Sequence, residues 1–351
     1  MIRPEGASLR DEEDTIIMST DTLPRSGPDR SARFFGRIVM AAAAALLLLL
    51  SILGWYWSRE PAVPPELPGA ADAVVGDRTT RTLIDVVGVL LGKPGGYLSN
   101  DVLPPGAWLD NMPNWEFGVL VQVRDLARAL RNDFSRSQSQ SREDPDLAIA
   151  EPQFNFDSES WLFPPSEGEY RQGVRALERY RKRLIDPEQP DAQFYARSDN
   201  LRSYLAIVEK RLGDLSQRLS ASAGVMRVDT ELAGDSAARR SAERPAEQFI
   251  QTPWLEIDDV FYEARGASWA LLQFLRAAET DFGPVLARKS AQQSMRQIIR
   301  ELEEAQQPLR SPVVLNGSGY GLWANHSLVL SSYLARAHGA IIDLRELLEQ
   351  G

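Results

Sequence analysis

Acidic residues that stand beside tryptophans are the first candidates for chemistry in this sequence. Asp110 and Glu116 share the turn-rich segment GGYLSNDVLPPGAWLDNMPNWEFG, residues 95–118, with Trp108 and Trp115. A glycosidase needs two carboxyl groups about 5–9 Å apart, and aromatic side chains commonly line ligand clefts. The segment therefore indicates either a carbohydrate site or a rigid connector whose aromatic side chains pack against the ends of helices.

The composition of this segment favours the connector. Its three prolines oppose a continuous helix, and Asn114 is a good N-cap for a helix that follows. Large apolar side chains are mostly buried in folded proteins. We therefore expect Trp108, Met112 and Trp115 to pack and to fix the path of the connector.

A second acidic group follows Trp254, in the run WLEIDD. Carboxylates in the first turn of a helix interact favourably with its dipole, so this group needs no catalytic explanation. No residue is assigned a catalytic role; the acids that a carboxylate mechanism would use are Asp110, Glu116 and Asp258. The candidates for a ligand or partner surface are Trp108, Trp115, Trp161, Trp254 and Trp323.

Other motifs argue against cofactors. His326 and His338 lie twelve residues apart in one predicted helix, about 120° apart around its axis, so they cannot share a metal ion. The glycine-rich run NGSGYG, residues 316–321, lacks the strand and lysine of a nucleotide-binding loop. The chain has no cysteine, which excludes thiolate sites, and its net charge of −10 disfavours nucleic-acid binding. We expect no cofactor, no metal, no nucleotide and no nucleic acid.

An uncharged apolar run, IVMAAAAALLLLLSILGWYWS, occupies residues 38–58. As a helix of about 21 residues it would be roughly 30 Å long, enough to cross a bilayer. Trp55, Tyr56 and Trp57 stand at its far end, where aromatic rings favour the membrane interface. The run therefore predicts a transmembrane helix, with the lipid bilayer as its first partner.

The charges around this run predict its orientation. Arg30, Arg33 and Arg37 precede it closely, whereas only Arg59 follows closely. The positive-inside rule then places residues 1–37 in the cytoplasm and residues 59–351 outside. A cleaved signal peptide is the alternative, but the apolar run is too long and the small-residue site at 71–73 lies too far beyond it.

The elements that must position these residues are helical. The predicted fold is all-α: an N-terminal transmembrane helix followed by a periplasmic antiparallel helical bundle of about six main helices. Predicted segments are a polar, disordered cytoplasmic tail (1–37), the span (38–58), a Pro-rich spacer that holds the domain off the bilayer (59–77) and a helical domain (78–351) with a possible mobile linker (222–248). Apolar residues recur at helical spacing within 83–90, 119–130, 166–184, 201–219, 252–275, 285–302 and 321–349.

Capping signals and the last helix refine this prediction. Ser166 with a glutamate three residues on forms a capping box, and Thr252 followed by proline predicts another helix start. In the last helix, Trp323, Leu330, Ala337 and Leu344 form one column, and Leu334, Ile341 and Leu348 form a second. Two such columns predict a seam against a neighbouring helix, or, as the alternative, a partner surface.

Long stretches resemble one protein family. They include LDNMPNWEFGVLVQVRDLARAL, PWLEIDDVFYEARGASWALL, RQIIRELEEAQ and NGSGYGLWANHSLVLSSYLARAHGAIIDLRELL. Over residues 78–350 the chain resembles an uncharacterised proteobacterial family of single-pass inner-membrane proteins, a family known as a domain of unknown function. The resemblance implies a Gram-negative cell envelope and implies no reaction, substrate or catalytic residue.

Three classes of function remain open. The first is a membrane-anchored periplasmic helical protein that acts through protein–protein interaction or scaffolding, without catalysis, with another envelope protein as its partner. The second is a sensor that binds an envelope glycan or lipid in a pocket between helices. The third is a carboxylate-based hydrolase of cell-wall material.

Overall fold

The computed structural model describes residues 30–65, 74–137, 142–188, 191–228 and 247–350. The chain divides into two units, Met1–Leu49 and Leu50–Gly351. The described chain is mostly helical, with 69% helix and 2% strand and an apolar helix near the N-terminus, as the sequence predicts. Most of the predicted cytoplasmic tail, part of the predicted spacer and most of the predicted linker fall outside the described residues.

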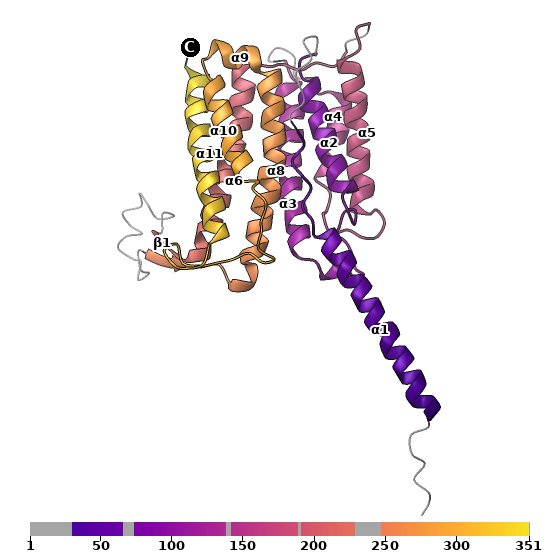
Figure 1. Ribbon diagram of the computed structural model, residues 1–351. Helices are drawn as coiled ribbons and strands as arrows, with labels where there is room; N and C mark the ends of the chain where they lie inside the picture. Colours follow the sequence, from indigo (N-terminus) through magenta and orange to yellow (C-terminus); the bar gives the residue numbers. More distant parts are fainter. Residues whose placement is uncertain (1–29, 66–73, 138–141, 189–190, 229–246, 351) are drawn as a thin grey trace, which may run out of the picture. The chain divides into compact units, whose positions relative to one another are not determined.

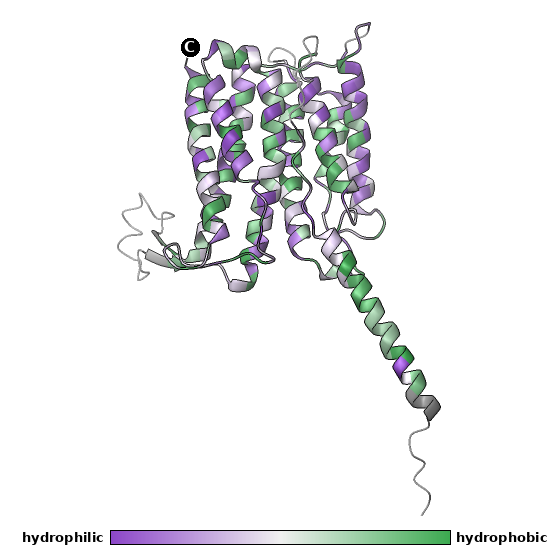
Figure 2. Ribbon diagram, viewed as in Figure 1, coloured by the Kyte–Doolittle hydropathy of each residue, from purple (hydrophilic) through white to green (hydrophobic). Residues whose placement is uncertain are grey.

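Helix α1 (Arg30–Trp57) contains the apolar run. Residues Phe34–Trp57 have a mean hydropathy of 2.5 in their most apolar stretch, of which only 6% is buried. Figure 2 shows this helix as an almost continuous hydrophobic element. A core helix of a soluble protein would be mostly buried, so α1 has the properties of a membrane anchor or of a signal sequence.

The second unit is an up-and-down helical bundle (Figure 1). Its helices alternate in direction along the chain (Figure 1). Each mixes hydrophobic and hydrophilic residues (Figure 2), and many of the hydrophobic ones are buried. The helices are α2 (Asp77–Gly92), α3 (Asn111–Ala129), α4 (Pro145–Phe154), α5 (Ser166–Leu184), α6 (Ser198–Ser220), α8 (Ile257–Asp281), α10 (Gln292–Glu304) and α11 (His326–Glu349), with the short α9 (Gly283–Arg288) between α8 and α10.

The alternation sorts the connections between helices into two sets. Connections 93–110, 155–165, 221–256 and 305–325 meet at one end of the bundle, together with the antiparallel strands β1 (Val225–Val228) and β2 (Glu247–Ile250). We call this the hairpin end. The connections after α3, α5 and α8, and the C-terminus, lie at the opposite end (Figure 1).

The core is continuous across the bundle. Helix α3 packs closely on α8, and α11 packs on α6 and α10. Gly118 and Gly266 make the first contact possible, because a Cβ at Gly118 would overlap the carbonyl oxygen of Glu263, and a Cβ at Gly266 would overlap that of Trp115. The apolar seam predicted for the last helix is confirmed for the residues that lie within α11, all of which are buried: Leu330, Leu334, Ala337, Ile341, Leu344 and Leu348.

Several helix starts differ from the sequence prediction. Helix α3 begins at Asn111, and Asp110 is its N-cap, accepting a hydrogen bond from the Asn111 N–H at 2.8 Å. The predicted cap Asn114 therefore lies inside the first turn. A proline is tolerated at the preceding position, because first-turn N–H groups have no partner within the helix.

The predicted capping box at Ser166 does not form. The Ser166 hydroxyl donates to the carbonyl oxygens of Asp157 and Ser160 instead, which fixes the connection that precedes α5. The predicted start at Thr252 is also wrong, because a single turn, Trp254–Glu256, comes before α8 begins at Ile257.

Two elements had no strong signal in the sequence. Helix α4 spans only ten residues and contains an internal proline; Asp144 caps it, with Pro145 at its first position. The hairpin of β1 and β2 lies within and just beyond the predicted linker 222–248, and Val225 pairs with Ile250. Residues 229–246 lie outside the described residues.

Candidate functional site

Glu116 is at the centre of a buried polar cluster near the hairpin end. Its carboxylate lies 2.6 Å from the Lys93 ammonium, and the two side chains are 0% and 1% exposed. It also accepts hydrogen bonds from the Leu98 N–H at 2.9 Å, the Ser99 N–H at 2.8 Å and the Ser99 hydroxyl at 2.6 Å. Burial raises the pKa of Glu116, and the Lys93 charge opposes that rise.

This arrangement gives Glu116 a structural role. Its oxygens already accept from the connection 93–110, and Lys93 also donates to the Gly96 carbonyl oxygen at 2.7 Å. The same connection is tied to the one before α5, since Tyr97 donates to the Ser158 carbonyl oxygen at 3.0 Å and Asn100 donates to that of Ser160 at 2.8 Å. Glu116 therefore holds the connection 93–110, which is tied in turn to the connection before α5, and it has no exposed surface on which to meet a substrate.

The other two acidic candidates, Asp110 and Asp258, both lie within electrostatic reach of Asp259. Asp259 accepts a hydrogen bond from the Asn114 side chain at 2.6 Å, which joins the first turns of α3 and α8. Burial raises the pKa of Asp259, and the nearby charges of Asp258, Asp110 and Glu256 raise it further. The second acidic group thus lies within electrostatic reach of the first, although Asp110 is occupied as the cap of α3.

The tryptophan candidates separate into two kinds. Trp115 is fully buried, with its ring centroid 5.3 Å from that of Trp269, so it belongs to the core and to no surface; Met112 is buried as well. Trp108, predicted to pack, is 60% exposed. Trp161, Trp254 and Trp323 are also exposed, at 55%, 78% and 73%. Their role as a ligand or partner surface remains a prediction.

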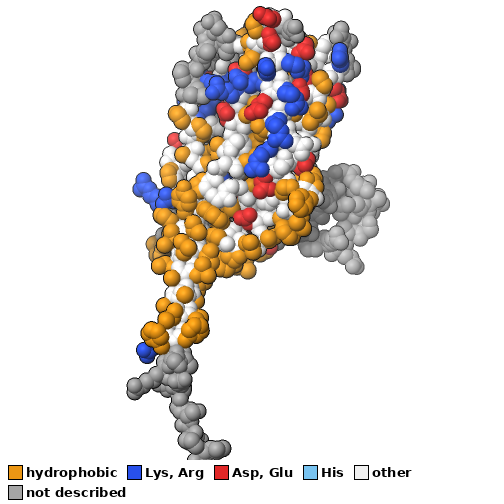
Figure 3. Space-filling view, turned by 90° about the vertical axis from the view of Figure 1, so that its right-hand side faces the viewer, with side chains coloured by type: hydrophobic (Ala, Val, Ile, Leu, Met, Phe, Trp, Pro, Cys, Tyr) orange, Lys and Arg blue, Asp and Glu red, His pale blue; other side chains and the backbone are white. Residues whose placement is uncertain are grey.

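These exposed tryptophans belong to a larger apolar surface that the sequence did not reveal. Each lies in a different connection of the hairpin end, next to other exposed apolar side chains. We call this set the apolar rim: Leu103 and Trp108, Trp161 to Phe163, Trp254 and Leu255, and Tyr320 to Trp323 apart from its glycine. Figure 3 shows hydrophobic side chains gathered over this end of the bundle, whereas most charged side chains of the displayed face lie further from it.

The last turns of α1 pack against the same end. Gly54 lies against Pro105 and Leu109, and the indole of Trp57 lies against Gly95. Gly95 has a φ of 87° and no room for a Cβ beside that indole, so glycine is required there on both counts. The junction between α1 and the bundle is therefore a packed contact.

The chain after α1 continues as a strap, residues 59–65, along α8. Glu60 pairs with Arg265 at 2.6 Å, and Arg265 also donates to the Ala305 and Gln307 carbonyl oxygens. Further along α8, Arg276 donates to the Pro64 carbonyl oxygen at 3.1 Å. These residues of the predicted spacer thus contact the bundle, because side chains of α8 pair with them or donate hydrogen bonds to them.

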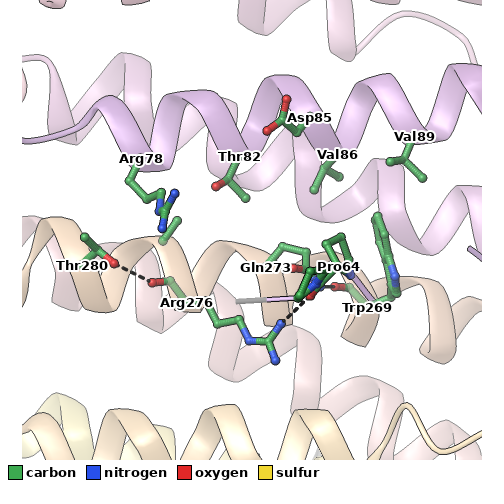
Figure 4. A pocket seen from close by; sticks show the side chains of 12 residues that line it. Pro64, Arg78, Thr82, Asp85, Val86, Val89, Trp269, Gln273, Arg276 and Thr280 are labelled. Atoms are coloured by element: carbon green, nitrogen blue, oxygen red, sulfur yellow. Dashed lines mark hydrogen bonds between the residues drawn. The ribbon is translucent and has the colours of Figure 1, made fainter. Parts of the chain in front are cut away.

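A cavity of about 110 Å³ lies between the strap, α2 and α8 (Figure 4). Its lining is mixed, with Trp269 and Val86 beside Arg78, Asp85 and Arg276. Ligand pockets are usually about 300–1,000 Å³ in volume, so this cavity suits water better than an organic ligand. The three acidic candidates lie elsewhere.

The described residues contain no group of three or more histidine or acidic side chains placed to hold a metal ion. His326 has a structural contact: its Nδ1 accepts from the Leu315 N–H at 3.0 Å, and Asn325 caps α11 through the Leu328 N–H at 2.9 Å. Both residues stabilise the turn that opens the last helix, as their position in the sequence suggests.

A family model matches most of the chain. The family model of DUF2333, described as an uncharacterised protein conserved in bacteria, matches residues 31–351, and so covers α1 as well as the bundle. The resemblance to an uncharacterised bacterial family that was inferred from the sequence is thereby confirmed. No curated protein and no solved structure matches the chain.

Proposed function

Since the chain belongs to DUF2333, an uncharacterised family conserved in bacteria, we propose that it is an anchored envelope protein that works by binding rather than by catalysis. In this proposal α1 crosses the inner membrane, residues 1–37 are cytoplasmic and the bundle is periplasmic. The bundle binds another envelope protein and acts as a scaffold at the membrane surface. The packed junction between α1 and the bundle is the observation that carries the proposal.

That junction supports an anchor over a signal peptide. Cleavage near residues 71–73 would remove Glu60 and leave Arg265, whose side chain is 7% exposed, without its carboxylate. It would also remove Trp57, which is partly buried against the core. Burying a charge without a partner is costly, so the mature bundle needs the segment that a signal peptidase would discard. The family model also includes α1.

The arginines around α1 support the orientation. Arg37 and the two arginines before it precede the apolar run, and the positive-inside rule assigns that side to the cytoplasm. The side chains of Arg30 and Arg33 lie outside the described part of α1.

The state of the acidic candidates supports binding over hydrolysis. Glu116 is buried and fully engaged, and Asp110 caps a helix. Asp259, not Asp258, makes the contact between α3 and α8. A hydrolase would need an exposed pair of carboxyl groups at a cleft.

Site-specific photo-cross-linking in cells tests the proposal. A cross-linking amino acid at Arg175, on the exposed face of α5, or at Glu188, at the opposite end, should give discrete protein adducts. Asp110→Asn and Asp258→Asn should leave those adducts unchanged, because neither acid has a catalytic role. The absence of any adduct from a correctly inserted protein, or loss of adducts with either substitution in a folded bundle, would contradict it.

A further inference from the structure

The distribution of exposed aromatic side chains in the bundle is one-sided. Among the described residues after 58, the exposed aromatic side chains belong to the connections of the hairpin end, from Trp108 in the first to Trp323 in the last, with the exception of Phe117 in α3. Phe163 and Leu322 are almost fully exposed, at 95% and 102%. Contiguous apolar surface of this kind marks a place that meets a protein or a membrane.

The junction with α1 favours a membrane over a protein as the partner of this apolar surface. Trp55 and Tyr56 are exposed at the end of the apolar helix, where a membrane-spanning segment would place them at the interface. Gly54, one turn earlier, lies against Pro105 and Leu109. Trp108 stands between those two contact residues in the sequence, so the first connection of the rim must lie at the depth where the helix leaves the bilayer.

The strap holds the hairpin end close to the last turn of α1. No unattached spacer separates Trp57 from the bundle, because Glu60 is already paired with Arg265 on α8. Trp269 donates to the Ala62 carbonyl oxygen at 3.4 Å, two residues further along. These contacts all lie within the second unit, and they keep the residues that directly follow α1 against the bundle.

We propose that the apolar rim rests in the headgroup region of the same bilayer that α1 crosses, so that the bundle is docked on the membrane through its hairpin end. The inference rests on the proposed membrane anchor. Tryptophan and tyrosine favour that region, because their rings are apolar and their polar atoms can stay hydrated.

The charges near the rim indicate which lipids it fits. Asp110, Glu256 and Asp258 lie at the hairpin end. Of the described basic side chains near it, Lys93 is buried against Glu116, whereas Arg59 and Arg310 are exposed, so acidic side chains outnumber exposed basic ones. Docking therefore depends on apolar insertion into a zwitterionic surface and gains nothing from anionic lipid, unlike the binding of polybasic segments.

Spin-label accessibility in nanodiscs tests the docking. The chain has no cysteine, so one introduced cysteine carries the only label. Full-length protein in phosphatidylcholine nanodiscs, one copy per disc, would be labelled at Phe163→Cys or Leu322→Cys in the rim. Leu46→Cys in α1 is the control for insertion, and Glu188→Cys at the opposite end is the control for water. The readout is the collision rate with oxygen, which partitions into lipid, relative to a water-soluble nickel chelate.

We expect this ratio at Phe163 and Leu322 to exceed that at Glu188 several-fold and to approach that at Leu46. Partial replacement of phosphatidylcholine by phosphatidylglycerol should not raise it. If the rim labels were as accessible to the nickel chelate as the label at Glu188 while the label at Leu46 lay deep in lipid, the docking would be overturned but the membrane anchor would be supported. This is the result expected if the rim binds a protein. A label at Leu46 that is also exposed to nickel would overturn the anchor, and the docking with it.

Discussion

Replacing Glu116 with alanine removes the shared acceptor of the cluster that holds the connection 93–110. The Lys93 ammonium, 2.6 Å away and 1% exposed, would keep its charge without a counter-ion. The Leu98 and Ser99 N–H groups would lose their acceptor as well. Leaving one member of a buried ion pair unpaired costs about 3–5 kcal/mol, and we expect Glu116→Ala to lower the free energy of unfolding by about 4 kcal/mol.

The appropriate assay is denaturant unfolding of the full-length protein in nanodiscs, followed by far-ultraviolet circular dichroism. The expected loss is large against a typical stability of about 5–15 kcal/mol. The double substitution Lys93→Met with Glu116→Gln removes both charges but keeps an acceptor oxygen for the N–H groups, so it should recover most of the loss. Glu178→Ala, on the exposed face of α5, is the control and should change stability by less than about 0.5 kcal/mol.

Two results would refute this reasoning. A loss below about 1 kcal/mol for Glu116→Ala would mean that the pair is no more important than a surface salt bridge. A double variant as unstable as Glu116→Ala would mean that the unpaired charge is not the cause of the loss.

Three further predictions concern packing, the strap and pH. Gly118→Ala should destabilise the bundle by about 1–3 kcal/mol, because α3 and α8 cannot separate locally. In the control Gly88→Ala the added Cβ meets no atom, so that substitution should be neutral or stabilising. If the two substitutions changed the unfolding free energy equally in urea titrations, the packing argument would be contradicted. Glu60→Ala should lower the free energy of unfolding by about 2 kcal/mol, since it leaves Arg265 without its carboxylate partner. The control Glu349→Ala, which breaks an exposed ion pair, should lower it by less than about 1 kcal/mol. A loss for Glu60→Ala as small as that of the control would mean that the Glu60–Arg265 pair does not hold the strap. Burial raises the pKa of Asp281 above its ordinary 3.8. The folded protein therefore keeps the Asp281 proton to a higher pH than the unfolded chain does. The contribution of Asp281 to stability consequently falls as pH rises from 3.8 through the raised pKa. The unfolding free energy of Asp281→Asn relative to the unchanged chain should therefore increase over that window in urea titrations, and a pH-independent difference would count against it.

The helices were largely predictable because their apolar residues recur with helical period. The α11 columns from Leu330 to Leu348 are buried as expected, and α1 was evident from length and lack of charge. Helix starts were less predictable, because local signals compete. Asp110 and Asn114 are both good caps, and tertiary contacts of α3 decide between them.

The sequence identified the four tryptophans of the apolar rim as surface candidates but could not show that they form one surface, because its members are scattered over connections far apart in the chain. A single exposed Trp161 or Leu322 is unremarkable in a loop, and only the alternating helix directions bring these loops to one end. Glu116 was misleading for a related reason. Its buried partner Lys93 lies on another element, so its engagement was visible only in three dimensions.

Topology mapping tests the central claim, that α1 anchors a periplasmic bundle, most directly. Single cysteines at Glu188, in the bundle, and at Ser26, before α1, would be treated with a membrane-impermeant maleimide in intact spheroplasts and after lysis. We expect Glu188→Cys to react in intact spheroplasts and Ser26→Cys to react only after lysis. The reverse pattern would contradict the orientation, and release of the Glu188→Cys bundle without α1 into the soluble fraction would contradict the anchor.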